Sequence, residues 1–247
     1  MGKKMKIILK CLLFFFMLMT LSGCLSAREI NDLEIVVGIG VDKDEEPGKI
    51  LLTAQVVKDT AGRASENGSE GDGKAFWNVS SRGNSVFDAV RQITYKTGNR
   101  LFISHNQAVI FGYDIAAEGL EEYIDYFLRA HEMRPTALIL VAEGRASDIL
   151  NIKPETEKFP AFNIAKLVDS YVFTSNFYKV NMKEFASCLM SDTSAQMAPL
   201  VSIAQDEESN DIYMSGMVVF KRGKMVGKLT HDEVRGLLWV LGKVTSG

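Results

Sequence analysis

The sequence predicts an α+β fold in which mixed sheets and interspersed helices form more than one domain. Three observations predict it: short β-rich apolar runs, amphipathic segments at helical spacing between them, and no regular strand–helix alternation. At 247 residues, with 47% hydrophobic and 24% charged residues, the chain is long enough to bury a core. No internal repeat and no heptad run is present in the sequence.

Apolar and β-branched runs mark the expected strands. Residues 33–41 are almost continuously apolar, as in a strand covered on both faces, and a charged turn at 42–48 leads to a partner strand at 50–58. Residues 60–74 contain no aliphatic residue beyond alanine and are interpreted as a mobile loop. Further strands are expected at residues 76–80, 101–111, 136–142, 212–220 and 225–229.

Capping residues and helical spacing mark the expected helices. Asn84 is expected to cap the first helix of the body. Asn181 with Glu184, and Thr230 with Glu233, have the spacing of capping boxes. Further helices are expected at residues 120–128, 146–151, 162–173, 182–190 and 232–241.

The first 23 residues have the pattern of a bacterial lipoprotein signal peptide. Four lysines precede an apolar run at residues 11–21, which is 11 residues long. A helix needs about 20 apolar residues to span a bilayer, so this run is short for a transmembrane segment and typical of a signal peptide. Residues 1–23 are therefore expected to be removed.

Leu21-Ser22-Gly23-Cys24 has the pattern of a lipobox, with cleavage expected between Gly23 and Cys24. The small residues let an extended backbone enter a narrow protease cleft, and the thiol of Cys24 supplies the nucleophile for S-diacylglycerol attachment, followed by N-acylation. Two fatty chains anchor a protein stably, whereas one anchors it marginally. Residues 24–32 would then be a lipidated tether. The alternatives are an ordinary secretory signal with a chance cysteine, or an uncleaved anchor.

The charge of the exported body argues against two kinds of partner. The signal segment carries four lysines and no acid, so its removal changes the net charge from −3 to −7. An acidic body disfavours binding to nucleic acid, which needs basic side chains, and a polybasic contact with anionic lipid. Of the three cysteines only Cys188 would remain as a free thiol, so no intramolecular disulfide is expected. Cys188 is interpreted as a buried residue on a helix.

No motif indicates catalysis, a cofactor or a metal. His105, His131 and His231 stand apart, without ligands at metal-binding spacing. Gly38-Ile39-Gly40 lacks the third glycine of a dinucleotide fingerprint and is interpreted as permitting close strand packing.

Two charged groups were also considered as sites. Asp42, Asp44 and Glu46 begin like a calcium loop, but the later ligand positions do not match, so a solvated turn is the better interpretation. Residues 129–134 contain a charged cluster of Arg129, Glu132 and Arg134. This cluster is either a contact for a partner or an exposed ion-pair network.

An acidic segment without apolar residues, 205–211, marks the expected domain boundary. The predicted domains are an N-terminal α+β domain at 33–205 and the start of a second α+β domain, a hairpin plus a helix, at 206–247.

Three stretches resemble the Ger(x)C family, the lipoprotein C subunits of nutrient germinant receptors in spore-forming bacteria. They are residues 24–44, residues 100–112 with the following segment to Gly144, and residues 219–247. Family members often carry an aromatic residue after the lipidated cysteine, whereas Leu25 follows here. The family pattern also continues beyond Gly247, so the resemblance implies a fold that lacks its C-terminal part.

The resemblance implies a subunit without enzymatic activity or cofactor, anchored through lipid at Cys24 to the outer face of the cell or inner spore membrane. It implies assembly with A- and B-type membrane subunits in a receptor for amino acids, sugars or nucleosides. The alternative is an extracytoplasmic solute-binding lipoprotein that feeds a transporter.

Overall fold

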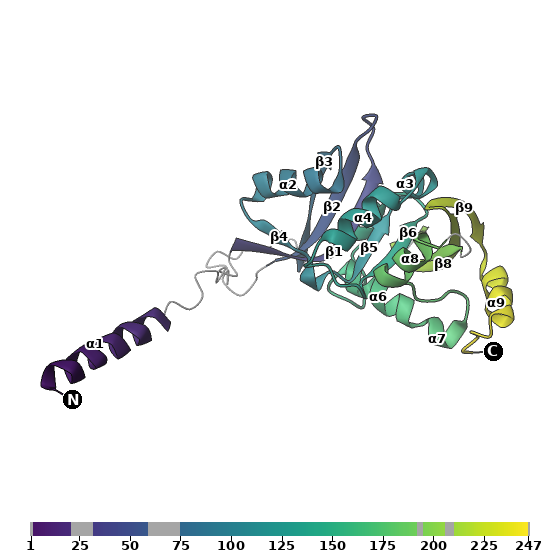
Figure 1. The fold of residues 1–247 in the computed structure, drawn as a ribbon. Helices are drawn as coiled ribbons and strands as arrows, with labels where there is room; N and C mark the ends of the chain where they lie inside the picture. The colour runs from purple at the N-terminus through teal and green to yellow at the C-terminus, as the bar shows by residue number, and fades with distance from the viewer. Residues whose placement is uncertain (1, 21–31, 59–74, 192–194, 206–209, 247) are drawn as a thin grey trace. The chain divides into compact units, whose positions relative to one another are not determined.

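The computed structural model describes residues 2–20, 32–58, 75–191, 195–205 and 210–246. The chain divides into two compact units, Met1–Asp32 and Leu33–Gly247. The first contains helix α1 (Lys3–Thr20), drawn in purple in Figure 1. Among the residues that the structure describes, no helix is both long and apolar enough to cross a membrane.

The described strands of the second unit form one mixed sheet in the order β3-β2-β1-β5-β6-β7-β8-β9, with β4 paired to the start of β1. Strands β1, β5, β6 and β7 are parallel, and antiparallel strands flank them on both sides. This mixed sheet with interspersed helices confirms the predicted α+β class. The strands are β1 (Leu33–Lys43), β2 (Ile50–Val57), β3 (Phe76–Gly83), β4 (Arg100–Phe102), β5 (Ala108–Phe111), β6 (Leu138–Ala142), β7 (Gln196–Gln205), β8 (Asn210–Lys221) and β9 (Lys224–Leu229).

Helices cover both faces of this sheet. They are α2 (Val86–Thr97), α3 (Tyr113–Glu118), α4 (Glu121–Arg129), α5 (Ala146–Asn151), α6 (Pro160–Asp169), α7 (Tyr171–Thr174), α8 (Met182–Leu189) and α9 (His231–Val240), with a 3₁₀ turn, η2 (Ile103–His105). Because both faces are covered, the parallel strands read as continuous apolar runs, and all residues of β5 and β6 are buried.

Gly38 and Gly40 let α5 and α6 approach one face of β1 closely. A Cβ on Gly38 would lie 2.8 Å from the Cβ of Ala161, and one on Gly40 would lie 3.1 Å from that of Ala146. The interpretation that these glycines permit close strand packing is therefore wrong: they make room for helices. Helix α4 packs on the opposite face of the sheet. Gly40 pairs with Ile110, and because side chains alternate along a strand, the next residue, Phe111, points to the other face. There its ring contacts Phe127 of α4.

The predicted strand at 101–111 is two strands separated by a turn. Ile35 pairs with Phe102 and Gly38 pairs with Ala108, so three steps along β1 correspond to six along its neighbour. The three additional residues form η2. The predicted helix at 162–173 also divides, since α6 ends at Asp169 and α7 begins at Tyr171.

Local capping follows the expectations at two of three helices. The capping boxes of α8 and α9 are confirmed. At α2 the cap is Ser85, whose hydroxyl accepts from the Asp88 N–H, and the prediction of Asn84 is wrong. The backbone N–H of Asn84 instead donates to the Asp88 carboxylate, at 3.1 Å. Ser85 thus accepts from the Asp88 backbone, and Asn84 donates to the Asp88 side chain.

The predicted domain boundary falls in the connection between β7 and β8. These strands pair with each other up to Gln205 and Asn210, within the same sheet. Strand β7 and helix α3 were not predicted. The predicted loop at 60–74 lies outside the described residues. The division into domains at 205/206 stays a prediction.

Candidate functional site

A groove of about 690 Å³ lies between α2 and α4. Phe87, Val90 and Arg91 line it from α2, and Tyr126 and Arg129 line it from α4. Strand β4 and the 3₁₀ turn contribute Arg100, Leu101 and Ile103 to the same groove. Binding sites for ligands have volumes of about 300–1,000 Å³ and combine apolar walls with a few polar groups. The groove has both properties and is the candidate site.

Core contacts hold the two helices that form the walls. In α2 the residues that face the sheet, Val86, Ala89 and Ile93, are buried at helical spacing. A Cβ on Gly83 would lie 2.5 Å from the backbone nitrogen of Ala89, so glycine permits this close approach of α2 to β3. In α4, Phe127 is 1% exposed and packs edge-on against Phe111. Both walls of the groove are therefore anchored in the core.

Two ion pairs lie in the groove. Arg100 Nη2 is 2.7 Å from Glu132 Oε1, and Arg129 Nε is 2.8 Å from Asp125 Oδ2. The predicted cluster of Arg129, Glu132 and Arg134 is thus not a single network, because Glu132 pairs with a residue on β4. Of the three, only Arg129 and Glu132 line the groove.

Arg91 has other kinds of contact than Arg100 and Arg129, which both form ion pairs. Its Nη2 donates to the hydroxyl of Tyr95 at 3.0 Å, and its guanidinium lies 5.7 Å from the centroid of the Phe87 ring. Within the described ranges, no carboxylate forms an ion pair with Arg91. Both of these contacts are to uncharged groups, so no described side chain neutralises the charge of Arg91 by an ion pair.

Tyr126 gives the groove a neutral hydrogen-bonding group. Burial, reinforced by the negative charge of Glu132, raises the pKa of Tyr126 above its usual value. The phenol therefore stays protonated at neutral pH and remains available as a donor.

The three histidines lie in separate places. His105 ends η2, His131 lies exposed at the groove, and His231 Nε2 is 2.9 Å from the carbonyl oxygen of Met214. In the part of the chain that the structure describes, no three His, Cys, Asp or Glu side chains are placed to hold a metal ion.

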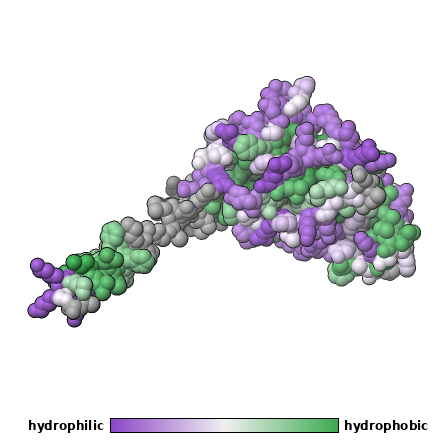
Figure 2. Space-filling view, viewed as in Figure 1, coloured by the Kyte–Doolittle hydropathy of each residue, from purple (hydrophilic) through white to green (hydrophobic). Residues whose placement is uncertain are grey.

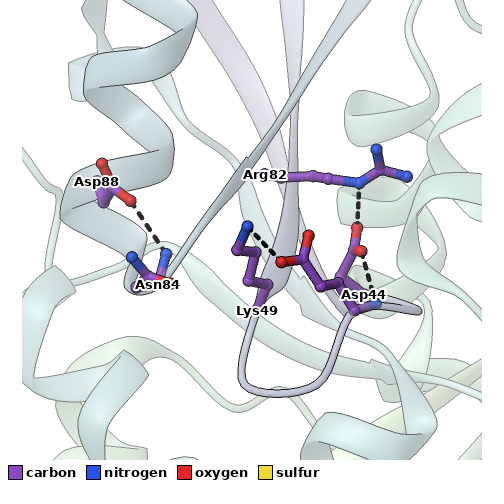
Figure 3. A network of polar contacts seen from close by, with 6 residues as sticks. Asp44, Lys49, Arg82, Asn84 and Asp88 are labelled. Carbon is purple, nitrogen blue, oxygen red and sulfur yellow. Dashed lines mark hydrogen bonds and ion pairs between the residues drawn. The ribbon is translucent and has the colours of Figure 1, made fainter.

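The carboxylates at the end of β1 and in the turn that follows it have different partners, and Figure 3 shows those of Asp44. Asp44 accepts from Arg82 Nε at 2.7 Å and from the backbone N–H of Glu46 at 3.0 Å. These two contacts hold the pKa of Asp44 below its usual value, with the backbone bond as the larger cause. Glu46 pairs with Lys49 at 2.7 Å, and Asp42 points to helix α5.

The lipobox residues Leu21, Ser22, Gly23 and Cys24 lie outside the described residues, so lipidation and cleavage stay predictions. Cys188 lies on α8 and is half-buried, not fully buried as predicted. Sequence reasoning also missed the groove, whose walls come from segments about 35 residues apart. The sequence indicated a site in this region only through the charged residues Arg129 and Glu132.

Comparison with known families identifies the class of this α+β body. Residues 26–203 match the family described as "Spore germination protein N-terminal domain". Residues 215–247 match the family described as "Spore germination B3/ GerAC like, C-terminal". The chain belongs to the GerAC-type family of spore germination proteins. No solved structure is significantly similar to it.

Curated relatives agree with this assignment. Spore germination protein KC of Bacillus subtilis is 28% identical, over 95% of this chain and 63% of the relative. Spore germination protein YndF of the same organism is 28% identical over 97% and 63%, and spore germination protein B3 is 24% identical over 98% and 64%. The chain thus spans somewhat less than two thirds of the length of these relatives.

Proposed function

We propose that this protein is a non-catalytic, lipid-anchored C subunit of a spore nutrient-germinant receptor. Its role in germination would be exerted by assembly with A- and B-type membrane subunits. The observation that carries the proposal is the family match over residues 26–203, preceded by the lipobox pattern at 21–24 with one residue between them. The family domain thus begins two residues after the expected lipidated cysteine, Cys24.

A lipid anchor has a physical purpose in such a receptor. Two fatty chains at Cys24 would hold the body on the outer face of the cell or inner spore membrane. Confinement to a surface raises the effective concentration of the body beside integral partners, so that weak contacts suffice for assembly. An acidic body needs this anchor, because its net charge of −7 after cleavage would repel anionic lipid.

The solute-binding alternative is less well supported. Binding proteins of that class close two domains around a ligand by a hinge. The described strands of residues 33–246 form one continuous sheet, and the groove lies between two helices packed on it. This arrangement favours a body that presents a surface to partners.

The anchor is tested by comparing Cys24→Ser with Cys188→Ser in the full chain, expressed in a spore-forming host. We expect Cys188→Ser to incorporate labelled palmitate and to sediment with membranes as the wild type does. Cys24→Ser should lose the label and either leave the membrane fraction or persist as precursor. Retention of the label in Cys24→Ser would show that the anchor is wrongly assigned.

The germination role is tested in spores that lack the gene. Loss of response to at least one amino acid, sugar or nucleoside is expected, with recovery on expression of the wild type but not of Cys24→Ser. Spores that respond to every nutrient like the parent would contradict the proposal.

A further inference from the structure

The α2–α4 groove has the properties of a contact surface, and the geometry points to its occupant. We infer that it docks an extracytoplasmic peptide segment of a membrane-embedded partner, which presents apolar side chains and one carboxylate that pairs with Arg91. The inference rests on the proposed function, because it places the body beside a membrane through Cys24.

Two aromatic residues and an arginine form a stripe along α2, which begins at the groove. Phe87, Arg91 and Tyr95 are spaced four residues apart and therefore form one stripe of the helix. The Arg91 guanidinium contacts the Phe87 ring and the Tyr95 hydroxyl, so the three side chains are already ordered. Phe87 is 58% exposed and Tyr95 is 68% exposed. Ordered, exposed aromatic and arginine side chains are typical of the residues that dominate binding at protein interfaces.

The charges of the groove specify the chemistry of the occupant. Arg100 and Arg129 already have carboxylate partners at 2.7 and 2.8 Å. Arg91 has none among the described residues, and its planar guanidinium can bind a carboxylate through two parallel hydrogen bonds. A partner carboxylate at this position would be held between apolar side chains, where ion pairs are stronger than in open water.

The openness of the surface favours a peptide over a small molecule. A pocket for a small ligand buries about 70–90% of that ligand. Here the stripe continues past the groove to Tyr95, which is not part of the groove lining. Figure 2 shows apolar surface, in green, bordered by polar surface in the region where Figure 1 places α2. An elongated segment can use both the groove and the exposed stripe.

The position of the groove in the chain favours a partner at the membrane. Strand β4 contributes Arg100 and Leu101 to the groove, and it pairs with Leu33–Ile35, the first residues of the body. Residues 24–32 number nine, and nine residues span at most about 32 Å in any conformation. If Cys24 carries the lipid, Leu33, which pairs with Arg100 of β4, cannot lie farther than this from the anchor. A segment of an integral protein that emerges from the same membrane can therefore reach the groove.

The test is photocrosslinking of the full chain in its native membranes. A benzoylphenylalanine is placed at Phe87, and in a control at Phe173, which is 76% exposed on α7. We expect an adduct with an integral membrane protein from position 87 and not from position 173. Mass spectrometry should map the adduct to an extracytoplasmic segment that contains Asp or Glu. No adduct at position 87, equal adducts at both positions, or an adduct with a second copy of this chain would overturn the inference.

Charge reversal tests the role of Arg91. Arg91→Glu should lower the yield of the adduct about tenfold or more. Lys96→Glu, the same charge change on the same helix outside the groove lining, should lower it less than twofold. Replacement of the mapped partner carboxylate by Lys should restore the adduct of Arg91→Glu. An unchanged yield in Arg91→Glu, or failure of this restoration, would contradict the inference.

Both charge variants are first shown to melt like the wild type and to remain in the membrane fraction. Failure of the anchor itself would instead appear in the wild type, as absence of the body from membranes. The two failures are therefore distinguishable.

Discussion

The carboxylate of Asp42, near the end of β1, accepts a hydrogen bond from the backbone N–H of Ala146 at the start of α5, with 2.6 Å between Oδ1 and N. Its second oxygen accepts from the N–H of Ser147 at 2.9 Å. The residue before α5, Arg145, makes no side-chain cap. A strand residue 104 positions earlier thus does the work of an N-cap.

Removal of this distant cap should destabilise the fold. Asp42→Ala leaves two N–H groups at the start of α5 without a partner, and we expect a loss of about 2 kcal/mol in the free energy of unfolding. Asp148→Ala, an exposed acid in the first turn of the same helix, should cost less than about 0.5 kcal/mol. Urea denaturation measures both values. Equal losses would mean that Asp42 does not cap α5.

Asp42 should also make stability depend on pH in an unusual direction. Burial raises the pKa of Asp42, although the N–H bonds from α5 oppose this effect. Because the value in the folded state lies above that in the unfolded state, folding takes up a proton, and the associated stability is lost as the pH rises above about 4. The wild type should therefore lose stability relative to Asp42→Asn as the pH rises through this range. The measurement is denaturation of both proteins between pH 3 and pH 7. A constant difference in the free energy of unfolding between the wild type and Asp42→Asn would contradict this prediction.

Asp44, two residues later, should have the opposite dependence. Its pKa is lowered by the Glu46 N–H and by Arg82, so its contribution is present above the unfolded value and lost as the pH falls through the folded one. We expect Asp44→Asn to lower the denaturation midpoint at pH 7 and to resemble the wild type near pH 2. Glu46→Gln, which breaks only the exposed pair with Lys49, should have little effect at either pH. A deficit of Asp44→Asn that persists unchanged in acid would exclude this role for the charge.

Side chains on Gly38 should force α6 away from the sheet. Gly38→Val places atoms within 2.8 Å of Ala161, and overpacking of this kind costs about 1–3 kcal/mol. The control is Gly227→Val on the exposed strand β9, where a Cβ would meet nothing within 4 Å. We expect the control to change stability by less than about 0.5 kcal/mol in thermal or urea unfolding. Similar losses in both variants would show that the close approach of α6 is not the reason for glycine at position 38.

Phe127 should be the main support of the groove wall. It is 1% exposed against Phe111, and Phe127→Ala should cost about 3–5 kcal/mol. Leu128→Ala, the adjacent residue of α4 with 50% exposure, should cost less than about 1 kcal/mol. If Phe127→Ala and Leu128→Ala unfold at the same urea concentration, α4 is not held by this aromatic contact.

Local signals in the sequence predicted those features that depend on nearby residues. Thr230 and Glu233, three positions apart, form their capping box because both partners lie in one helical turn. Strands β1 and β2 follow from two apolar runs joined by a short charged turn. The prediction of Asn84 as the cap of α2 is wrong because Asn and Ser can both cap a helix, and only the backbone path decides that Ser85 does so.

The candidate site could not be predicted in the same way. Its ion pair between Arg100 and Glu132 joins residues 32 positions apart, and its stripe on α2 reads in the sequence as an ordinary amphipathic helix. Similarly, the break between β4 and β5 depends on the registers of both strands against β1. Strands that are buried on both faces read as continuous apolar runs, and such runs do not indicate how two distant strands align.

The sequence by itself determined the α+β class, most helices and strands, the two capping boxes and the lipobox pattern, since each depends on residues within a few turns of one another. The tertiary structure alone decided which face each helix covers, the capping of α5 by Asp42, and the groove between α2 and α4. Those features arise where segments far apart in the chain come into contact. The packing of their side chains, and not local propensity, determines the free energy of these contacts.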